Sequence, residues 1–170
     1  KKSMLSLKRT LAGLVMSVAT ATAMAQATPD ALIKQVSTEV IDTIKGDKTL
    51  QSGDVSKIIS LVDAKVMPHV NFQRMTASAV GRNWRTATPE QQKRLQEEFK
   101  TLLVRTYAGA LTQVKDQTVQ LKPLRAAAED TEVVVRTEVK GKGEPIQLDY
   151  RLEKAEAAWK IYDVNVLGVW

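Results

Sequence analysis

The sequence has no cysteine and a single histidine, and both shortages restrict its chemistry. Without cysteine, neither a disulfide framework nor a thiolate metal site can form. The one histidine, His69, follows Pro68 at the end of a predicted helix. We expect an orienting or capping role for it, because no partner for an imidazole is evident. No HExxH, GxSxG or phosphate-loop glycine pattern occurs either. The sequence therefore contains no recognisable catalytic or metal-binding motif, and we expect no cofactor.

Acidic residues are missing from the start of the chain, where none precedes Asp30 and four cations fall within the first nine positions. The apolar run over residues 11–23 is too short to span a bilayer as a helix. It ends in Ala23-Met24-Ala25, a small-residue pattern typical of a cleavage site. The pattern predicts a secretory signal peptide over residues 1–25 and a mature domain over residues 26–170.

The net charge of +6 does not indicate nucleic-acid binding, because much of it belongs to this N-terminal segment. Removing residues 1–25 takes away four of the 25 basic residues and no acid, which leaves 21 bases against 19 acids, or +2. The length of 170 residues and the hydrophobic fraction of 44% are typical of one globular domain. We therefore expect a soluble exported protein that binds no nucleic acid.

A long amphipathic helix is predicted from Thr88 to about Lys115. Thr88 can act as its N-cap, Pro89 fits the first helical position, and Gln91 completes a capping box. Three- and four-residue spacing places its apolar residues on one face. That predicted face comprises Leu95, Phe99, Leu102, Leu103, Thr106, Ala110 and Val114. A helix of this kind requires a large apolar surface to lie against, and we expect the segment downstream of it to supply one.

Three shorter helices are predicted before it, over residues 28–45, from Ser52 or Asp54 to residue 66, and over residues 71–84. Gly81 lies beside the apolar stripe of the third helix. Its missing side chain predicts a close approach by another helix.

The hydrophobic period changes from 3.6 to 2 after Lys115. Alternating segments at residues 119–121, 132–139, 146–153 and 159–166 predict strands joined by short turns. Helices therefore come first and strands second. We expect an α+β fold in which the N-terminal helices pack on one face of a C-terminal antiparallel meander.

The apolar faces of helices and sheet allow two interpretations. They can form a packed core, or they can stand apart and enclose an apolar ligand. Periodicity does not separate these interpretations, because both need the same faces. Alternation also predicts that Asp149 points to water and that Asp163, with the parity of Trp159 and Ile161, lies at the inner rim of the sheet. For Asp163 we favour a structural role there.

Specific residues carry a resemblance to a known family. The segment over residues 66–111 reads VMPHVNFQRMTASAVGRNWRTATPEQQKRLQEEFKTLLVRTYAGAL. Together with Tyr150-Arg151-Leu152 and the segment WKIYDV at residues 159–164, it resembles the MlaC family of phospholipid-binding proteins, also called the toluene-tolerance family. The matching features include Phe72, Gly81, Trp84-Arg85 and the TPEQ start of the long helix. Family members usually continue into a further helix past the position of Trp170, so we expect this domain to lack that helix.

The resemblance implies a monomeric periplasmic carrier that holds phospholipid as cargo between helices and sheet. It implies partners in an outer-membrane lipoprotein–porin complex and in an inner-membrane ABC transporter with an MCE-type subunit, and a role in outer-membrane lipid asymmetry. Head groups would stay near solvent, where exposed cations such as Arg82 and Arg85 permit weak contact. By this analogy, acyl chains contact Val62, Val66, Val70, Phe72, Met75, Val80, Trp84, Phe99, Leu103, Tyr107, Val133, Val135, Ile146, Leu148, Tyr150, Trp159 and Ile161.

Two other functions fit the predicted architecture. An NTF2-like isomerase or dehydratase would need an acid or base inside an apolar cavity, and Asp163 is the best candidate. A periplasmic adaptor with a solid core would have no cavity at all.

Overall fold

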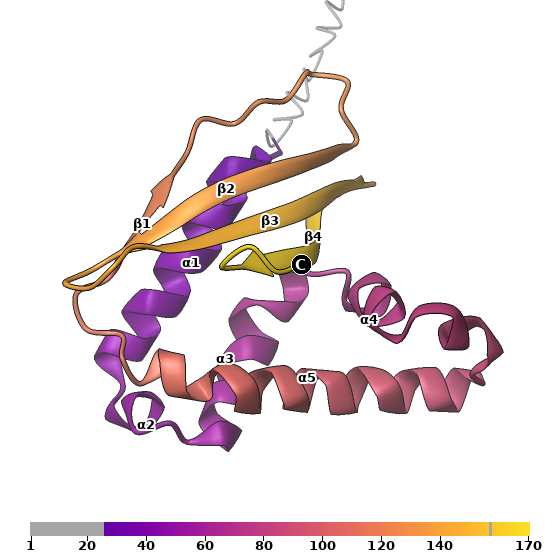
Figure 1. Ribbon diagram of the computed structural model, residues 1–170, viewed down its shortest axis with the longest axis horizontal. Helices are drawn as coiled ribbons and strands as arrows, with labels where there is room; N and C mark the ends of the chain where they lie inside the picture. Colours follow the sequence, from indigo (N-terminus) through magenta and orange to yellow (C-terminus); the bar gives the residue numbers. More distant parts are fainter. Residues whose placement is uncertain (1–25, 157) are drawn as a thin grey trace, which may run out of the picture.

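The computed structural model describes residues 26–156 and 158–170 (Figure 1). The predicted signal peptide, residues 1–25, lies outside the described residues. The helices are α1 (Pro29–Gly46), α2 (Lys48–Gln51), α3 (Val55–Lys65), α4 (Phe72–Val80) and α5 (Pro89–Leu111), with 3₁₀ segments at Met67–His69 and Gly81–Thr86. The strands are β1 (Thr118–Leu121), β2 (Glu132–Lys140), β3 (Ile146–Ala155) and β4 (Ala158–Val166). This order confirms the predicted α+β fold.

The four strands form an antiparallel sheet in the order β1-β2-β3-β4, which is the predicted meander. Register partners such as Val135 and Tyr150, or Tyr150 and Val164, place apolar side chains of three strands on one inner face. Helix α1 lies across this inner face (Figure 1). Its residues Ile33 and Val36 pack with Val135 and Leu152 in the first core cluster.

A second core cluster joins the helices to one another, away from the sheet. Ile44 of α1, Leu50 of α2 and Ile58 of α3 are buried together with Val104 and Ala108 of α5. Helix α5 lies against α3 and α4, and Figure 1 shows it crossing the molecule at a distance from the sheet. The apolar surface for the long helix is therefore supplied by the helices upstream of it, and the prediction of a downstream surface was wrong. Within the described residues, no helix combines the length and apolar character needed to cross a membrane.

The N-terminus of α5 has the predicted capping box. The Thr88 hydroxyl accepts the Gln91 backbone N–H at 3.3 Å, and the Gln91 side chain accepts the Thr88 backbone N–H at 2.9 Å. The predicted apolar face was wrong in part, because Leu102, Thr106 and Ala110 are exposed. Val104 and Ala108 are buried instead, and Leu103 and Leu111 beside them are half-buried. Adjacent rows of this helix are both partly apolar, and the position of α3 decides which one is covered.

Gly81 ends α4 for a reason other than close packing. Its φ of 70° is a conformation that side-chain-bearing residues rarely adopt, and no atom lies within 4 Å of the position that a Cβ would occupy. The predicted close approach of another helix was therefore wrong. The predicted helix over residues 71–84 is likewise interrupted here, and a 3₁₀ segment follows.

A β-bulge in β4 reverses one prediction about the faces of the sheet. Arg151 pairs with Asp163, but the next residue, Leu152, pairs with Ile161, so Tyr162 is an extra residue in β4. An extra residue shifts every later side chain to the opposite face. Asp163 therefore lies on the outer face beside Arg151, and its predicted position at the inner rim was wrong.

We predict that two leucine-to-alanine substitutions have very different effects. Leu152 is fully buried between α1 and the sheet, so Leu152→Ala should lower the free energy of unfolding by about 2–5 kcal/mol. Leu102 is 60% exposed on α5, so Leu102→Ala should change it by less than about 0.5 kcal/mol. Urea denaturation of residues 26–170 measures both values. A large loss for Leu102→Ala would contradict the observed orientation of α5.

Candidate functional site

An apolar cavity of about 320 Å³ lies between the inner face of the sheet and the helices. Its size is at the lower end of the range usual for small-molecule sites. Helices α1, α3, α4 and α5 contribute most of the wall, and the rest comes from β3, β4 and the connection between α3 and α4. It is lined by Ile33, Val36, Ser37, Val40, Ile58, Val62, Val66, Met67, Val70, Phe72, Met75, Lys100, Leu103, Val104, Tyr107, Leu111, Tyr150, Ile161 and Val164. The helices and the sheet therefore stand apart here, as the ligand-binding interpretation predicts.

Few polar groups reach this cavity. Burial raises the pKa of the Tyr150 phenol, while the hydroxyl groups of Ser37 and Thr137 act in the opposite direction. The phenol is therefore neutral at physiological pH and can donate or accept a hydrogen bond. Tyr107 of α5 is 43% exposed, so this part of the wall is open to water. Such a site can bind an apolar molecule and offer a few neutral polar contacts.

Nine of the residues that we predicted as acyl contacts line the cavity. They are Val62, Val66, Val70, Phe72, Met75, Leu103, Tyr107, Tyr150 and Ile161. Three of them, Val62, Val66 and Val70, come from the end of α3 and the connection between α3 and α4. There Val70 forms a parallel bridge with Ile161, and the Asn71 N–H donates to the Ile161 carbonyl at 2.8 Å. This pairing holds the connection against the edge of the sheet, beside the cavity.

The structure places the other eight outside the cavity lining. They are Val80, Trp84, Phe99, Val133, Val135, Ile146, Leu148 and Trp159. Val133 and Val135 are covered by α1 in the first core cluster, and Ile146 is 43% exposed at one end of the sheet. Phe99 does not line the cavity, but its ring stacks on that of Phe72, which does, with ring centroids 5.7 Å apart.

Trp84 lies in a different hollow, of about 480 Å³, together with Arg74, Arg82 and Arg85. This arginine hollow is formed by α4 and the 3₁₀ segment after it, and it shares no lining residue with the apolar cavity.

Several lining residues were not among the predicted contacts. Ile33, Val36 and Val40 form the apolar row of α1, but their spacing does not distinguish a packed helix from a cavity wall. Val164 was missed because strict alternation in β4 places it on the outer face, whereas the bulge at Tyr162 turns it inward.

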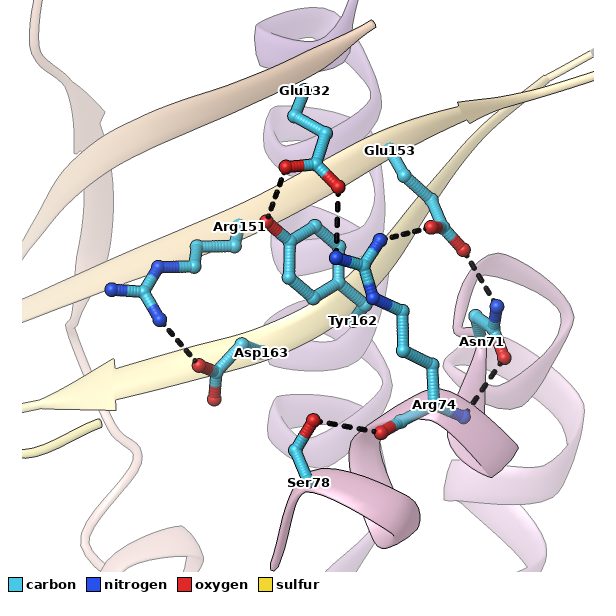
Figure 2. Close-up of polar contacts among 8 residues, drawn as sticks. All are labelled: Asn71, Arg74, Ser78, Glu132, Arg151, Glu153, Tyr162 and Asp163. Carbon is cyan, nitrogen blue, oxygen red and sulfur yellow. Dashed lines mark hydrogen bonds and ion pairs between the residues drawn. The ribbon is translucent and has the colours of Figure 1, made fainter.

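A cluster of polar residues fixes α4 to the outer face of the sheet (Figure 2). Glu132 and Glu153 are register partners on β2 and β3, and two facing carboxylates repel each other. The Arg74 guanidinium lies between them, at 2.8 Å from Glu132 and in contact with Glu153. It also lies 3.5 Å from the centre of the Tyr162 ring, a cation–π geometry. We call these four residues the Arg74 network.

The Arg74 network has a consequence for the cavity. Phe72 and Met75, which flank Arg74 on α4, both line the cavity. Asn71, the N-cap of α4, adds a hydrogen bond of 2.6 Å to Glu153. Polar contacts on the outer face of the sheet therefore position the wall of an apolar cavity near its inner face.

Asp149 does not point to water as predicted. It lies on the outer face but is only 7% exposed, and its cross-strand partner Asn165 is buried as well. One carboxylate oxygen accepts a hydrogen bond from Gln147 at 3.1 Å and lies 3.9 Å from Arg136. The other, Oδ1, has no hydrogen-bond partner in the part of the chain that the structure describes.

Asp163 lies near Asp149 on the same outer face, where it accepts a hydrogen bond from Arg151 at 2.9 Å (Figure 2). It is absent from the lining of the cavity, so the predicted acid or base inside the cavity is not supplied by Asp163. In the described ranges 26–156 and 158–170, no group of three or more histidine or carboxylate residues is arranged to hold a metal ion.

Comparisons with known proteins agree on one family. The family model described as MlaC protein matches residues 34–170. The intermembrane phospholipid transport system binding protein MlaC of Haemophilus influenzae is 24% identical over 154 residues, covering 88% of this chain and 72% of that protein. The toluene tolerance protein ttg2D of Pseudomonas putida is 27% identical over 147 residues, covering 86% and 68%.

A solved structure agrees in both sequence and fold. The phospholipid-binding protein of Ralstonia solanacearum, determined in complex with a phospholipid, has 52% sequence identity and a TM-score of 0.82. The match covers 85% of this chain and 80% of that chain.

The Arg74 network predicts a pH-dependent contribution to stability. The hydrogen bond from Arg74 lowers the pKa of Glu132 below its usual value. A carboxyl group with a lowered folded-state pKa stabilises the fold above its unfolded pKa, and this contribution is lost as the pH falls through the folded pKa. Arg74→Met should therefore lower the free energy of unfolding by about 1–2 kcal/mol at neutral pH, after allowance for solvent screening. Near pH 3 the decrease should be smaller.

Urea denaturation of both proteins at the two pH values measures this difference. The exposed Arg94 on α5 provides the matched control, since Arg94→Met should change stability by less than about 0.5 kcal/mol. An equal loss for Arg74→Met at both pH values would mean that packing of the arginine stem, not its ion pairs, stabilises α4.

Proposed function

Because the chain belongs to the MlaC family, we propose that it is a periplasmic phospholipid carrier whose apolar cavity holds acyl chains. The observation that carries this proposal is the space between the sheet and α5, which is lined almost entirely by apolar side chains. The Ralstonia solanacearum protein, which shares the fold at 52% identity, supports it because that protein was determined with a phospholipid bound.

The physical chemistry of such a cavity suits a carrier. Exposing acyl chains to water costs about 0.8 kcal/mol per methylene group, so a phospholipid leaves a membrane very slowly unaided. A cavity lined by valine, leucine and isoleucine cancels most of that cost. The free energies of the lipid in the cavity and in a bilayer can then be similar, which lets a carrier load and unload. No bond is made or broken in this process.

We assign the acyl contacts to two groups of residues. The first is the nine predicted residues that line the cavity. The second is the lining that the sequence did not single out, chiefly Ile33, Val36 and Val40 of α1 and Val164 of β4. The hydroxyl groups of Ser37 and Tyr150 are suited to the ester groups of a lipid, because each can donate a hydrogen bond.

The family and the N-terminal sequence suggest where the protein acts and with which partners. We propose that residues 1–25 direct export and that the domain acts as a monomer in the periplasm. It would exchange phospholipid with an outer-membrane lipoprotein–porin complex and with an inner-membrane ABC transporter carrying an MCE-type subunit, and so maintain outer-membrane lipid asymmetry. The name of the Haemophilus influenzae relative, a phospholipid transport system binding protein, supports a transport system as partner. Direction would come from the ATP-driven partner.

Native mass spectrometry of residues 26–170, purified without detergent, tests the carrier function. We expect a bound mass of phospholipid size that organic extraction identifies as phospholipid. Leu103→Trp, which fills the cavity, should reduce bound lipid about tenfold because overpacking opposes entry of the chains. Leu102→Trp, on the exposed side of the same helix, is the matched control and should retain lipid. A protein that stays without lipid after incubation with liposomes would contradict the proposal.

Asp163→Asn should leave lipid binding unchanged. Asp163 lies on the outer face with Arg151, so its replacement weakens one partly exposed ion pair without altering the cavity. The same mass measurement checks this result. A loss of bound lipid in a folded Asp163→Asn protein would mean that Asp163 acts on the cavity after all.

A further inference from the structure

One charged side chain takes part in the wall of the apolar cavity. Among the described lining residues, Lys100 of α5 is the one that carries a charge. It occupies the same row of α5 as Leu103 and Tyr107, and Tyr107 is 43% exposed. The Lys100 side chain itself is 23% exposed. The methylene groups of a lysine can cover an apolar surface while its ammonium group stays in contact with water. Lys100 therefore places a positive charge where the cavity meets solvent.

The ammonium group of Lys100 has donors to spare. It donates to Asp63 Oδ1 of α3 at 2.7 Å, and the Asp63 side chain is 48% exposed. An ammonium group has three N–H donors, so two remain for another acceptor. A pair of this exposure contributes little to stability, because water screens the attraction between the two charges. Stabilising the contact between α3 and α5 is thus a weak explanation for a lysine in an apolar wall.

A phospholipid combines the two features that the cavity can recognise near Lys100. Its acyl chains match the apolar lining, and its phosphodiester carries a negative charge close to the point where the chains begin. Charge-assisted hydrogen bonds to phosphate are stronger than neutral ones. The arginine hollow is another cationic region, but it lies on α4 and the segment after it and shares no residue with the cavity.

We propose that Lys100 is the residue that selects lipids bearing a phosphate, through a direct contact between its ammonium group and a phosphate oxygen. Asp63 is the counter-ion of Lys100 and competes with the phosphate, so the affinity of Lys100 for the head group stays moderate. This inference rests on the proposed carrier function and adds a selection rule to it. The cavity prefers a phospholipid to a diacylglycerol with the same acyl chains.

A competition experiment tests this selection. Delipidated residues 26–170 are incubated with vesicles that contain phosphatidylethanolamine and diacylglycerol with identical acyl chains, and the protein-bound lipids are extracted and quantified. The ratio of the two bound lipids is compared between variants. Partitioning within the vesicles cancels from this comparison, because every variant meets the same vesicles.

The expected results differ in sign between the two partners. Lys100→Gln should lower the ratio of bound phosphatidylethanolamine to diacylglycerol by about tenfold, while Asp63→Asn should raise it because the competing carboxylate is gone. A purely structural ion pair would move both variants in the same direction. Lys93→Gln, an exposed lysine on α5, and Arg82→Gln, in the arginine hollow, are the controls and should leave the ratio unchanged.

The remaining outcomes separate the two proposals. A folded Lys100→Gln protein with the wild-type ratio would overturn the role of Lys100, and a changed ratio in Arg82→Gln would place the head group at the arginine hollow instead. Soluble glycerophosphoethanolamine, added in excess, should displace no lipid. Displacement would indicate a soluble phosphate ester as ligand and would overturn the assignment. A wild-type protein that takes up neither lipid would contradict the carrier function itself.

Discussion

The contact between α1 and the sheet sets the positions of the other helices and the size of the cavity. Ile33, Val135 and Leu152 are almost completely buried in it, so the helix and the strands are fixed relative to one another. One helix is too narrow to cover the apolar inner face of a four-stranded sheet. The part near Tyr150, Ile161 and Val164 is left for other helices to enclose. Because α5 packs on α3 and α4, it encloses this region from a distance, and a cavity remains.

The far wall of that cavity depends on contacts outside it. Helix α4 is held to the outer face of the sheet by the Arg74 network and to α5 by the stacking of Phe72 on Phe99. The network also resolves an electrostatic problem, since Glu132 and Glu153 face each other across neighbouring strands. The same arginine therefore neutralises a repulsion in the sheet and positions two residues of the cavity wall.

Function as a carrier places opposing demands on such a cavity. The binding of acyl chains must compensate for their removal from a bilayer, yet the lipid must leave again at the next membrane. An apolar wall with few polar groups meets the first demand without tight, specific contacts. The pairing of Lys100 with Asp63 suits the second, because a charge that already has a counter-ion binds a phosphate less tightly than an isolated one.

The fold class, the order of the elements and the start of α5 could be predicted from the sequence. These depend on local rules, namely hydrophobic period, turn residues and the capping box at Thr88, and such rules act within a few residues. The family resemblance, combined with the face assignments that these rules allow, gave nine cavity residues, because an apolar face is the same whether it meets another side chain or a ligand.

Which apolar faces pack together and which enclose the cavity could not be predicted in this way, because it depends on how the helices are placed relative to the sheet. Leu102 and Leu103 are adjacent leucines in α5. Because of the position of α3, Leu102 is exposed to solvent and Leu103 lines the cavity. The bulge at Tyr162 moved Asp163 outward and Val164 inward, since one extra residue in β4 reverses alternation beyond it. The physical reason is common to both cases. A side chain's surroundings depend on segments distant in sequence, and a periodic pattern contains no information about the distance between two layers.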